Sequence, residues 1–133
     1  MRYLLDTNIC IYLIKKRPVE VIERFRQHSP KDVAISIITL FELQYGIEKS
    51  QYRKRSEDAL TKFLQPLDLI DLDRSSAIEA ANIRAQLEKK GMPIAPYDLL
   101  IAGLARSQSM TLVTNNTREF ERIADLRLEN WVE

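Results

Sequence analysis

The sequence is poor in the residues that support thiol and imidazole chemistry, with one cysteine and one histidine in 133 residues. Cys10 alone cannot form a disulfide within the chain, and with a single His28 it cannot complete a structural zinc site. We expect Cys10 to be a small core residue and His28 to be a solvated helix end. The lack of an internal disulfide and of a structural zinc site is typical of a protein from the reducing cytoplasm.

Glycine and long apolar runs are also scarce. Three glycines cannot supply either of the common glycine-rich phosphate loops, so a nucleotide-driven enzyme is disfavoured. No apolar run approaches the roughly 18 residues of a membrane span, and the N-terminus lacks the basic and then apolar pattern of a secretory signal. The sequence therefore predicts a soluble cytoplasmic protein without a membrane partner.

Neither sign of charge is in excess, because 20 Lys and Arg residues face 19 Asp and Glu residues. This balance excludes an acidic disordered tail and a histone-like basic protein, so any affinity for nucleic acid must come from local patches. Hydrophobic residues make up 45% of the chain, enough to bury a core without metal or disulfide staples. We expect a single domain over residues 1–133.

Short apolar runs alternate with segments of helical periodicity along the whole chain. The predicted strands are 1–6, 33–36, 67–72 and 111–114, with a short final strand around Trp131. The predicted helices are 9–14, 18–29, 38–49, 53–64, 76–91, 97–108 and 118–123. Strands that alternate with helices in this way pair in parallel through right-handed crossovers. The predicted fold class is α/β, a three-layer α/β/α sandwich around a parallel sheet.

Polar side chains at two helix starts are candidates for capping. Thr7 and Asn8 precede the first predicted helix, and Ser75 or Ser76 can cap the helix that ends at Gly91.

Acidic residues fall where strands end or helices begin. Asp6 ends the first strand, Glu42 lies one turn into the helix after the second, and Asp98 lies in the first turn of its helix. Asn116 and Glu119 follow the fourth strand. Ligands of open parallel sheets bind beyond the carboxyl ends of the strands, so we expect these side chains at one edge.

Carboxylates gathered there repel one another and raise one another's pKa unless a cation offsets their charge. Oxygen ligands with almost no His or Cys favour Mg²⁺ or Mn²⁺ over zinc. Such an ion can activate a water for attack on phosphorus, and the same ion or a second one about 4 Å away can stabilise the leaving oxygen. The pattern therefore points to phosphodiester hydrolysis.

A structural explanation also exists for most of these residues. Acidic residues in a first helical turn are favoured by the helix dipole, which would account for Glu42, Asp98 or Glu119 taken singly. Asp6 fits this explanation less well, because it follows an apolar strand directly. Two roles are open for three polar residues, which could cap a helix or form a turn, or could orient the acids. These residues are Thr7, Asn8 and Thr114.

Basic residues are concentrated early in the chain. Residues 15–31 contain six Lys or Arg residues against two Glu residues, a local charge of +4. They could be solvated helix faces or contacts to RNA phosphates. The candidates for RNA contact are Lys15, Lys16, Arg17, Arg24 and Arg26.

Four segments carry a resemblance to a known family. They are MRYLLDTN with Asp6, ISIITLFELQYG with Glu42, GMPIAPYDLLIAG with Asp98, and LVTNNTREF with Asn116 and Glu119. In this order they resemble the PIN-domain endoribonucleases, and within them the VapC toxins of prokaryotic VapBC toxin–antitoxin pairs. The resemblance spans essentially the whole chain. It implies a five-stranded parallel sheet and RNA cleavage that depends on Mg²⁺ or Mn²⁺, with tRNA among the expected targets.

The resemblance also implies roles for individual residues. Asp6 and Asp98 would be the principal metal ligands, and Glu42 a third ligand or the group that positions the attacking water. Some relatives carry an Asp at the position of Asn116, so here Glu119 would contact a second metal or water, with Asn116 as a polar helper. Thr7, Asn8 and Thr114 would orient the acids.

Partners follow from the same resemblance. It implies neutralisation by a cognate VapB-type antitoxin, which often places a basic side chain in the acidic pocket, and contact with operator DNA only through that antitoxin. The Leu-rich and Ile-rich early helices carry apolar surface that suits both a homodimer and an antitoxin helix laid in a groove.

Other functions fit parts of the pattern. A solitary PIN-domain nuclease of RNA processing would lack an adjacent antitoxin gene. A domain that has lost catalysis and binds RNA is favoured by Asn116 but opposed by intact Asp6, Glu42 and Asp98. A metal-dependent phosphatase or DNA nuclease would use similar carboxylate chemistry.

Overall fold

Five short strands form one parallel sheet in a computed structural model that describes residues 2–133 of the chain. The strand order is β3-β2-β1-β4-β5, with β1 at the centre. The strands are β1 Tyr3–Leu5, β2 Val33–Ser36, β3 Asp68–Ile70, β4 Thr111–Val113 and β5 Leu128–Glu129. All four pairings are parallel, as the alternation of strands and helices predicted.

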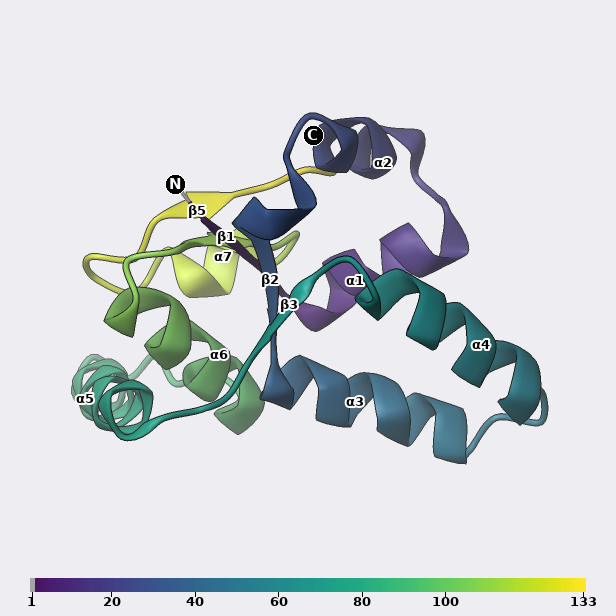
Figure 1. The fold of residues 1–133 in the computed structure, drawn as a ribbon. Helices are drawn as coiled ribbons and strands as arrows, with labels where there is room; N and C mark the ends of the chain where they lie inside the picture. Colours follow the sequence, from purple (N-terminus) through teal and green to yellow (C-terminus); the bar gives the residue numbers. More distant parts are fainter. Residues whose placement is uncertain (1) are drawn as a thin grey trace.

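Helices cover both faces of the sheet (Figure 1). The helices are α1 Thr7–Lys15, α2 Val19–Arg26, α3 Ile37–Glu48, α4 Arg53–Leu64, α5 Arg74–Lys89, α6 Pro96–Ser107 and α7 Thr117–Phe120, with a 3₁₀ turn at Pro30–Asp32. Helices α1 to α4 pack on one face, and α5, α6 and α7 on the other. The predicted three-layer α/β/α sandwich is confirmed. None of the helices within residues 2–133 has the length and apolar character needed to cross a membrane.

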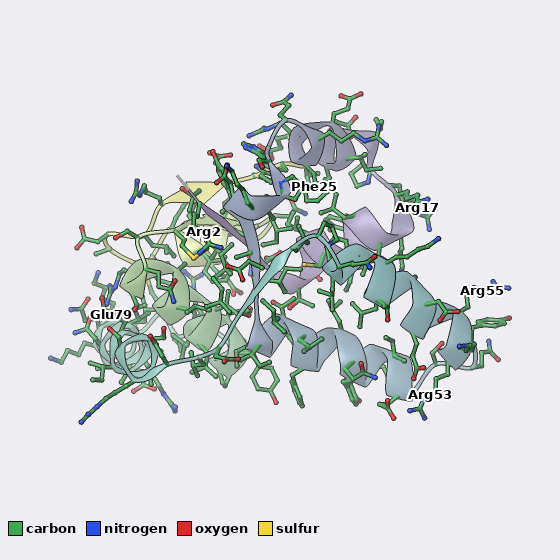
Figure 2. The ribbon with its side chains drawn as sticks, viewed as in Figure 1. Arg2, Arg17, Phe25, Arg53, Arg55 and Glu79 are labelled. Carbon is green, nitrogen blue, oxygen red and sulfur yellow. The ribbon has the colours of Figure 1, made fainter. Side chains whose placement is uncertain are left out.

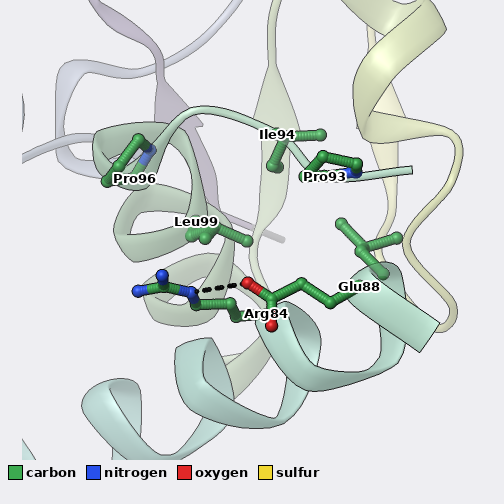
Figure 3. Close-up of a pocket in the computed structure, with 7 residues that line it drawn as sticks. Arg84, Glu88, Pro93, Ile94, Pro96 and Leu99 are labelled. Carbon is green, nitrogen blue, oxygen red and sulfur yellow. Dashed lines mark hydrogen bonds and ion pairs between the residues drawn. The ribbon is translucent and has the colours of Figure 1, made fainter. Parts of the chain in front are cut away.

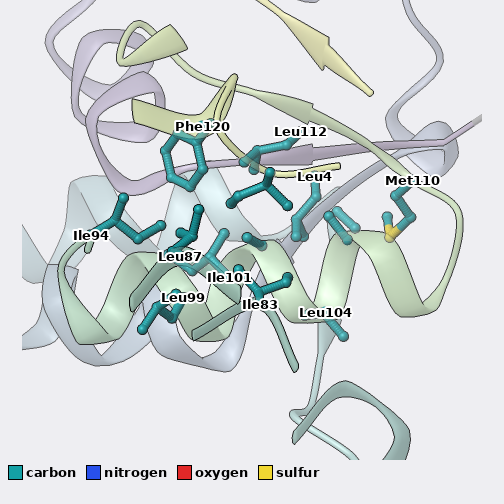
Figure 4. Close-up of a cluster of buried hydrophobic side chains, with 14 residues drawn as sticks. Leu4, Ile83, Leu87, Ile94, Leu99, Ile101, Leu104, Met110, Leu112 and Phe120 are labelled. Atoms are coloured by element: carbon teal, nitrogen blue, oxygen red, sulfur yellow. The ribbon is translucent and has the colours of Figure 1, made fainter. Parts of the chain in front are cut away.

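The central strands are buried on both faces, because successive side chains of a strand point to opposite sides. Leu4 of β1 and Leu112 of β4 pack against α5 and α6, in the cluster drawn in Figure 4. Leu5 and Val113 are their neighbours in sequence and pack toward α1 and α3 on the opposite face. Each such side chain stabilises the fold by about 1.5–3 kcal/mol. The sheet edge beyond β1 therefore stands on a rigid base.

Helix α6 is held against α5 by a close backbone approach at Gly103. A Cβ atom at this position would lie 2.7 Å from the Cβ of Ala80 and 2.7 Å from the carbonyl oxygen of Ser76. Only glycine fits this spacing without movement of α5. The close contact fixes the path of α6, and with it the start of the helix that carries Asp98.

Helix caps differ from those predicted. The Asp6 carboxylate, not Thr7 or Asn8, caps α1 by accepting a hydrogen bond from the backbone N–H of Ile9 at 3.0 Å. The cap is the last residue before the helical turn, and α1 begins directly at the end of β1, which leaves that position to Asp6. Asp73 likewise caps α5 in place of Ser75 or Ser76.

The final strand and His28 also differ from expectation. The strand is Leu128–Glu129, and Trp131 lies beyond it, fully buried, with its indole N–H donating to Glu129 at 3.0 Å. His28 is half-buried and stacks on Trp131 with ring centroids 5.1 Å apart, so it is not a solvated helix end. The two rings pack against each other across a long separation in the chain, and sequence periodicity does not reveal such a contact. Cys10 is buried, as predicted, and Met1 of the predicted first strand lies outside the described residues.

Candidate active site

Four carboxylates converge at the edge of the sheet where β1 and β4 end. Asp6 follows β1 directly, and Glu42 lies in the second turn of α3, which begins where β2 ends. Asp98 lies in the first turn of α6, and Glu119 in α7 beyond β4. The charges of Asp6, Glu42 and Glu119 all act on Asp98. The structure therefore brings together the four acids singled out in the sequence.

Asp6 is the most enclosed of the four, with 6% of its surface exposed. Burial raises its pKa, and the charge of Glu42 adds to that rise. A hydrogen bond from the Thr114 side chain and the backbone N–H groups of Ile9 and Asn8 act in the opposite direction and lower the pKa. Asn8 thus contributes its main chain, while its side chain is exposed. Asp6 is a buried acid whose charge is only partly compensated by the protein.

The pKa of Asp98 is raised to about 6, first by burial and then by the charges of Asp6, Glu42 and Glu119. A carboxyl group with this pKa still binds a proton in part of the molecules near neutral pH. The cluster therefore concentrates more negative charge than its surroundings offset, which is the electrostatic condition that favours binding of a cation.

Glu42 is positioned by a chain of hydroxyl groups. The Thr7 hydroxyl lies 2.7 Å from Glu42 Oε1, to which it donates, and 3.2 Å from the Thr39 hydroxyl. Ser36, at the end of β2, accepts from the Thr39 backbone N–H at 3.0 Å and caps α3. Ser36 and Thr39 are fully buried. Neither residue is among those predicted for the site, although a serine directly before a segment of helical periodicity is a capping signal.

A second chain of polar groups supports Glu119. The Asn116 side chain donates to Glu119 Oε2 at 3.1 Å, and the Asn116 backbone N–H donates to the Thr114 hydroxyl at 2.9 Å. Thr114 is fully buried and also interacts with Asp6. Asn116 therefore holds Glu119 in place, while Glu119 contributes the fourth negative charge at the site.

The basic residues near the end of α1 lie away from the acids. Helix α1 starts beside Asp6 and runs for nine residues to Lys15, a rise of about 14 Å. Figure 2 shows Arg17 at the outer edge of the helical layer. The exposed members of the predicted RNA contacts are Lys15, Lys16, Arg17 and Arg26. Arg24 differs from them, because it pairs with Glu129 at 3.1 Å and is half-buried.

The donor set of the acidic cluster suits a hard divalent cation, since carboxylates, hydroxyls and an amide supply oxygen atoms alone. No three His, Cys, Asp or Glu side chains within residues 2–133 stand close enough together to enclose a metal ion by themselves. Mg²⁺ commonly takes one or two carboxylates and completes its shell with water and substrate phosphate. The cluster fits that mode of binding rather than a closed protein cage.

An apolar groove of about 400 Å³ opens beside the cluster, between α1, α3 and α4. Its lining includes Glu42, so the groove and the acidic cluster share this residue. Lys15, the last residue of α1, also lines the groove. The apolar residues that line it are Ile11, Ile14, Leu43, Ile47 and Leu60.

A smaller cavity of about 110 Å³ lies under the loop between α5 and α6 (Figure 3). Its charged residues, Arg84 and Glu88, bond to each other at 3.1 Å, one turn apart on α5. None of the four acids lines this cavity, so it does not extend the candidate site.

The chain is similar to known proteins over nearly its full length. The PIN domain family matches residues 3–126. The tRNA(fMet)-specific endonuclease VapC of Shigella flexneri is 47% identical over 131 residues, which cover 98% of each chain. Ribonuclease VapC2 of Haemophilus influenzae is 47% identical over 132 residues, which cover 99% of each chain.

Solved structures of toxin–antitoxin complexes contain chains with the same fold. In the VapBC2 complex of Rickettsia felis bound to a promoter DNA fragment, one chain matches with a TM-score of 0.93 and 42% identity, over 98% of this chain and 99% of that one. A chain of the DNA-bound VapBC of Salmonella typhimurium matches with a TM-score of 0.92 and 45% identity, over 98% of each.

Proposed function

This chain belongs to the PIN domain family and, within it, to the VapC ribonucleases, and we propose that it hydrolyses RNA as the toxin of a type II toxin–antitoxin pair. The observation that carries the proposal is the electrostatic convergence of Asp6, Glu42 and Glu119 on Asp98. A structural role for these acids would not require four like charges at one sheet edge.

Asp6 and Asp98 are the groups that would hold Mg²⁺ or Mn²⁺, with Glu42 as a third ligand or as the residue that orients the attacking water. When bound, the ion would offset the carboxylate charges, favour deprotonation of water and stabilise charge on the reacting phosphate. Thr7 fixes the Glu42 carboxylate by a hydrogen bond to Oε1. Glu119, held by Asn116, would contact a second ion or a water.

We propose tRNA as the substrate class and tRNA(fMet) as the first molecule to test. The relatives from Shigella flexneri and Salmonella typhimurium, 47% and 45% identical, are named tRNA(fMet)-specific endonucleases. The exposed basic residues Lys15, Lys16, Arg17 and Arg26 would contact the RNA backbone. This reaction would take place in the cytoplasm.

The proposal is tested with purified protein freed of antitoxin and incubated with total tRNA and Mg²⁺. Sequencing of the 5′ ends should show one cleaved tRNA species and one cleaved bond. Failure to cut any tRNA under these conditions would contradict the proposal. An isolated gene with no adjacent antitoxin frame, combined with cleavage, would instead favour a solitary RNA-processing nuclease.

The apolar groove between α1, α3 and α4 is the proposed site of a VapB-type antitoxin. An amphipathic antitoxin segment would place apolar side chains in the groove and a basic side chain beside Glu42, which lines it. The basic group would offset the same repulsion that a cation offsets. A toxin homodimer, a hetero-oligomer with antitoxin and contact with operator DNA only through the antitoxin are parts of the same proposal.

Substitution of Gly46 by leucine is expected to weaken antitoxin binding by about tenfold or more while RNA cleavage persists. Gly46 lines the groove, and a Cβ atom there meets no heavy atom within 4 Å. The larger side chain would therefore occupy the groove without straining α3, and helix propensity would improve by roughly 1 kcal/mol. Calorimetric titration with the antitoxin encoded beside the gene measures the change. Gly46→Ala is the matched control, with near-normal affinity expected; equal affinity for the leucine variant would place the antitoxin elsewhere.

Substitution of Thr7 by valine is expected to lower kcat for RNA cleavage by about 10- to 100-fold with little change in stability. Valine keeps the shape of threonine but cannot donate to Glu42 Oε1, so the carboxylate loses the group that orients it. Thr7→Ser keeps the hydroxyl and should retain most of the activity. Full activity of the valine variant would show that Glu42 is oriented by other contacts.

A further inference from the structure

Two exposed aromatic rings lie against each other at the contact between α3 and α6. Phe41 is 54% exposed and Tyr97 is 46% exposed. Their ring centroids are 5.5 Å apart, with an angle of 71° between the planes. Edge-to-face packing of this kind leaves ring surface open to solvent. Exposed aromatic surface of this size costs solvation free energy, so it is more often retained where it meets a ligand.

The aromatic pair is built into the same helix crossing as the acids. Phe41 directly precedes Glu42 on α3, and Tyr97 directly precedes Asp98 on α6. Phe41 contacts Tyr97, and the charge of Glu42 acts on Asp98. Both interactions therefore link α3 to α6 near one crossing of the two helices. The crossing places one aromatic pair next to one acidic pair.

The aromatic surface continues along α3 and gains a positive charge. Tyr45 lies one turn after Phe41, on the same side of the helix, and is 58% exposed. The ammonium group of Lys49, one turn further, lies 4.6 Å from the centre of the Tyr45 ring. Aromatic rings interleaved with a cation match the bases and phosphates of single-stranded nucleic acid better than they match a purely apolar protein surface.

We propose that Phe41 and Tyr97 form a stacking platform for one unpaired base of the substrate RNA, next to the bond that is cut. This inference rests on the proposed ribonuclease function and adds to it two positioning residues and a preference for RNA loops. A base stacked here would bring the adjacent phosphate to the cation that Asp6 and Asp98 are proposed to hold, while Lys49 would attract a phosphate further along the strand. Stacking tolerates any base, so the platform would select unpaired structure more than sequence.

The test is a double-mutant cycle between the protein and the RNA. A synthetic stem–loop that contains the mapped cleavage site is made in a set, each member lacking the base at one position near that site. For the wild type, loss of the stacked base should lower kcat/KM by about tenfold, mostly through KM. Phe41→Ala and Tyr97→Ala should cause a similar loss on the intact RNA and lose little more on the RNA without that base. Tyr97→Phe should behave as the wild type.

Tyr52→Ala is the matched control, because Tyr52 is also 58% exposed but lies at the start of α4. It should cleave all the RNAs as the wild type does. Additive losses at every position would overturn the stacking proposal, and a loss of toxin self-association in sedimentation with no coupling to any base would assign the surface to a second copy of the chain. Since wild-type cleavage of the intact stem–loop is measured in the same experiment, failure of the platform and failure of the ribonuclease function are distinguishable.

Discussion

Replacement of Asp6 by asparagine is expected to lower RNA cleavage by about a thousandfold or more while the protein stays folded. The proposed role of Asp6 is to hold a divalent cation, and an amide in place of a carboxylate removes the negative charge that binds it. Asparagine is also a good N-cap residue, and its side-chain oxygen can still accept from the Ile9 backbone N–H. Cleavage rates with Mg²⁺ and circular dichroism spectra of both proteins measure the two effects.

Asp6→Ala separates the catalytic from the structural contribution. Alanine removes the charge and also the cap of α1, which costs about 1 kcal/mol of folding free energy. Asp6→Asn removes a buried carboxyl group whose pKa is raised by burial. The thermal midpoint of this variant should therefore equal or exceed that of the metal-free wild type. Undiminished cleavage by Asp6→Asn, in a preparation free of other nucleases, would remove Asp6 from the mechanism.

The architecture could be predicted because its signals are local. Runs such as Tyr3–Leu5 and Thr111–Val113 are apolar on both faces, as buried parallel strands require, and the segments between them have helical periodicity. The position of the acids follows from the same reasoning, since the edge at which parallel strands end is common to all of them. The sequence could therefore place Asp6 and Glu42 at one edge before their contacts were known.

Other features depend on packing between segments far apart in the chain. The hydroxyl chain from Ser36 to Glu42 passes through Thr7, 35 residues before Glu42, and no short-range pattern links the two. The stacking of His28 on Trp131 spans an even longer separation, and the final strand lies at Leu128–Glu129 rather than around Trp131. Asp6 is predicted from the sequence as an acid of the candidate site, but its capping of α1 depends on how closely the helix follows β1.

Removal of divalent cations is expected to lower RNA cleavage by about a thousandfold or more, and Mg²⁺ or Mn²⁺ should restore it. The carboxylates alone cannot offset the charge that develops on a reacting phosphate, because they carry the same sign. Dialysis against a chelator, followed by titration with each ion, measures the dependence. Full activity of the chelated protein would exclude a metal-assisted reaction at this site.

The repulsion among the four acids should also make the stability of the metal-free protein depend on pH, without any substrate. The pKa of Asp98 is about 6 in the folded protein against an ordinary value of 3.8, so between these pH values the folded state binds a proton more tightly than the unfolded chain does. The free energy of unfolding of the metal-free protein therefore rises as the pH falls through about 6, and levels off below 3.8. Asp6, whose pKa is also raised, acts in the same direction.

Mg²⁺ should oppose this trend, because it binds the ionised carboxylates and competes with their protons. We expect saturating Mg²⁺ to raise the thermal midpoint by roughly 5 °C above pH 7 and to have little effect near the ordinary pKa of the acids. Asp98→Asn should flatten the pH dependence and reduce the response to Mg²⁺, whereas Glu57→Gln, at a carboxylate that pairs with Arg53 on α4, should change neither. Thermal scans across pH, with chelator or with Mg²⁺, make the comparison. A metal-free midpoint that did not rise on acidification would mean that the four charges are already offset by the protein, and the electrostatic reason for a cation at this edge would be lost.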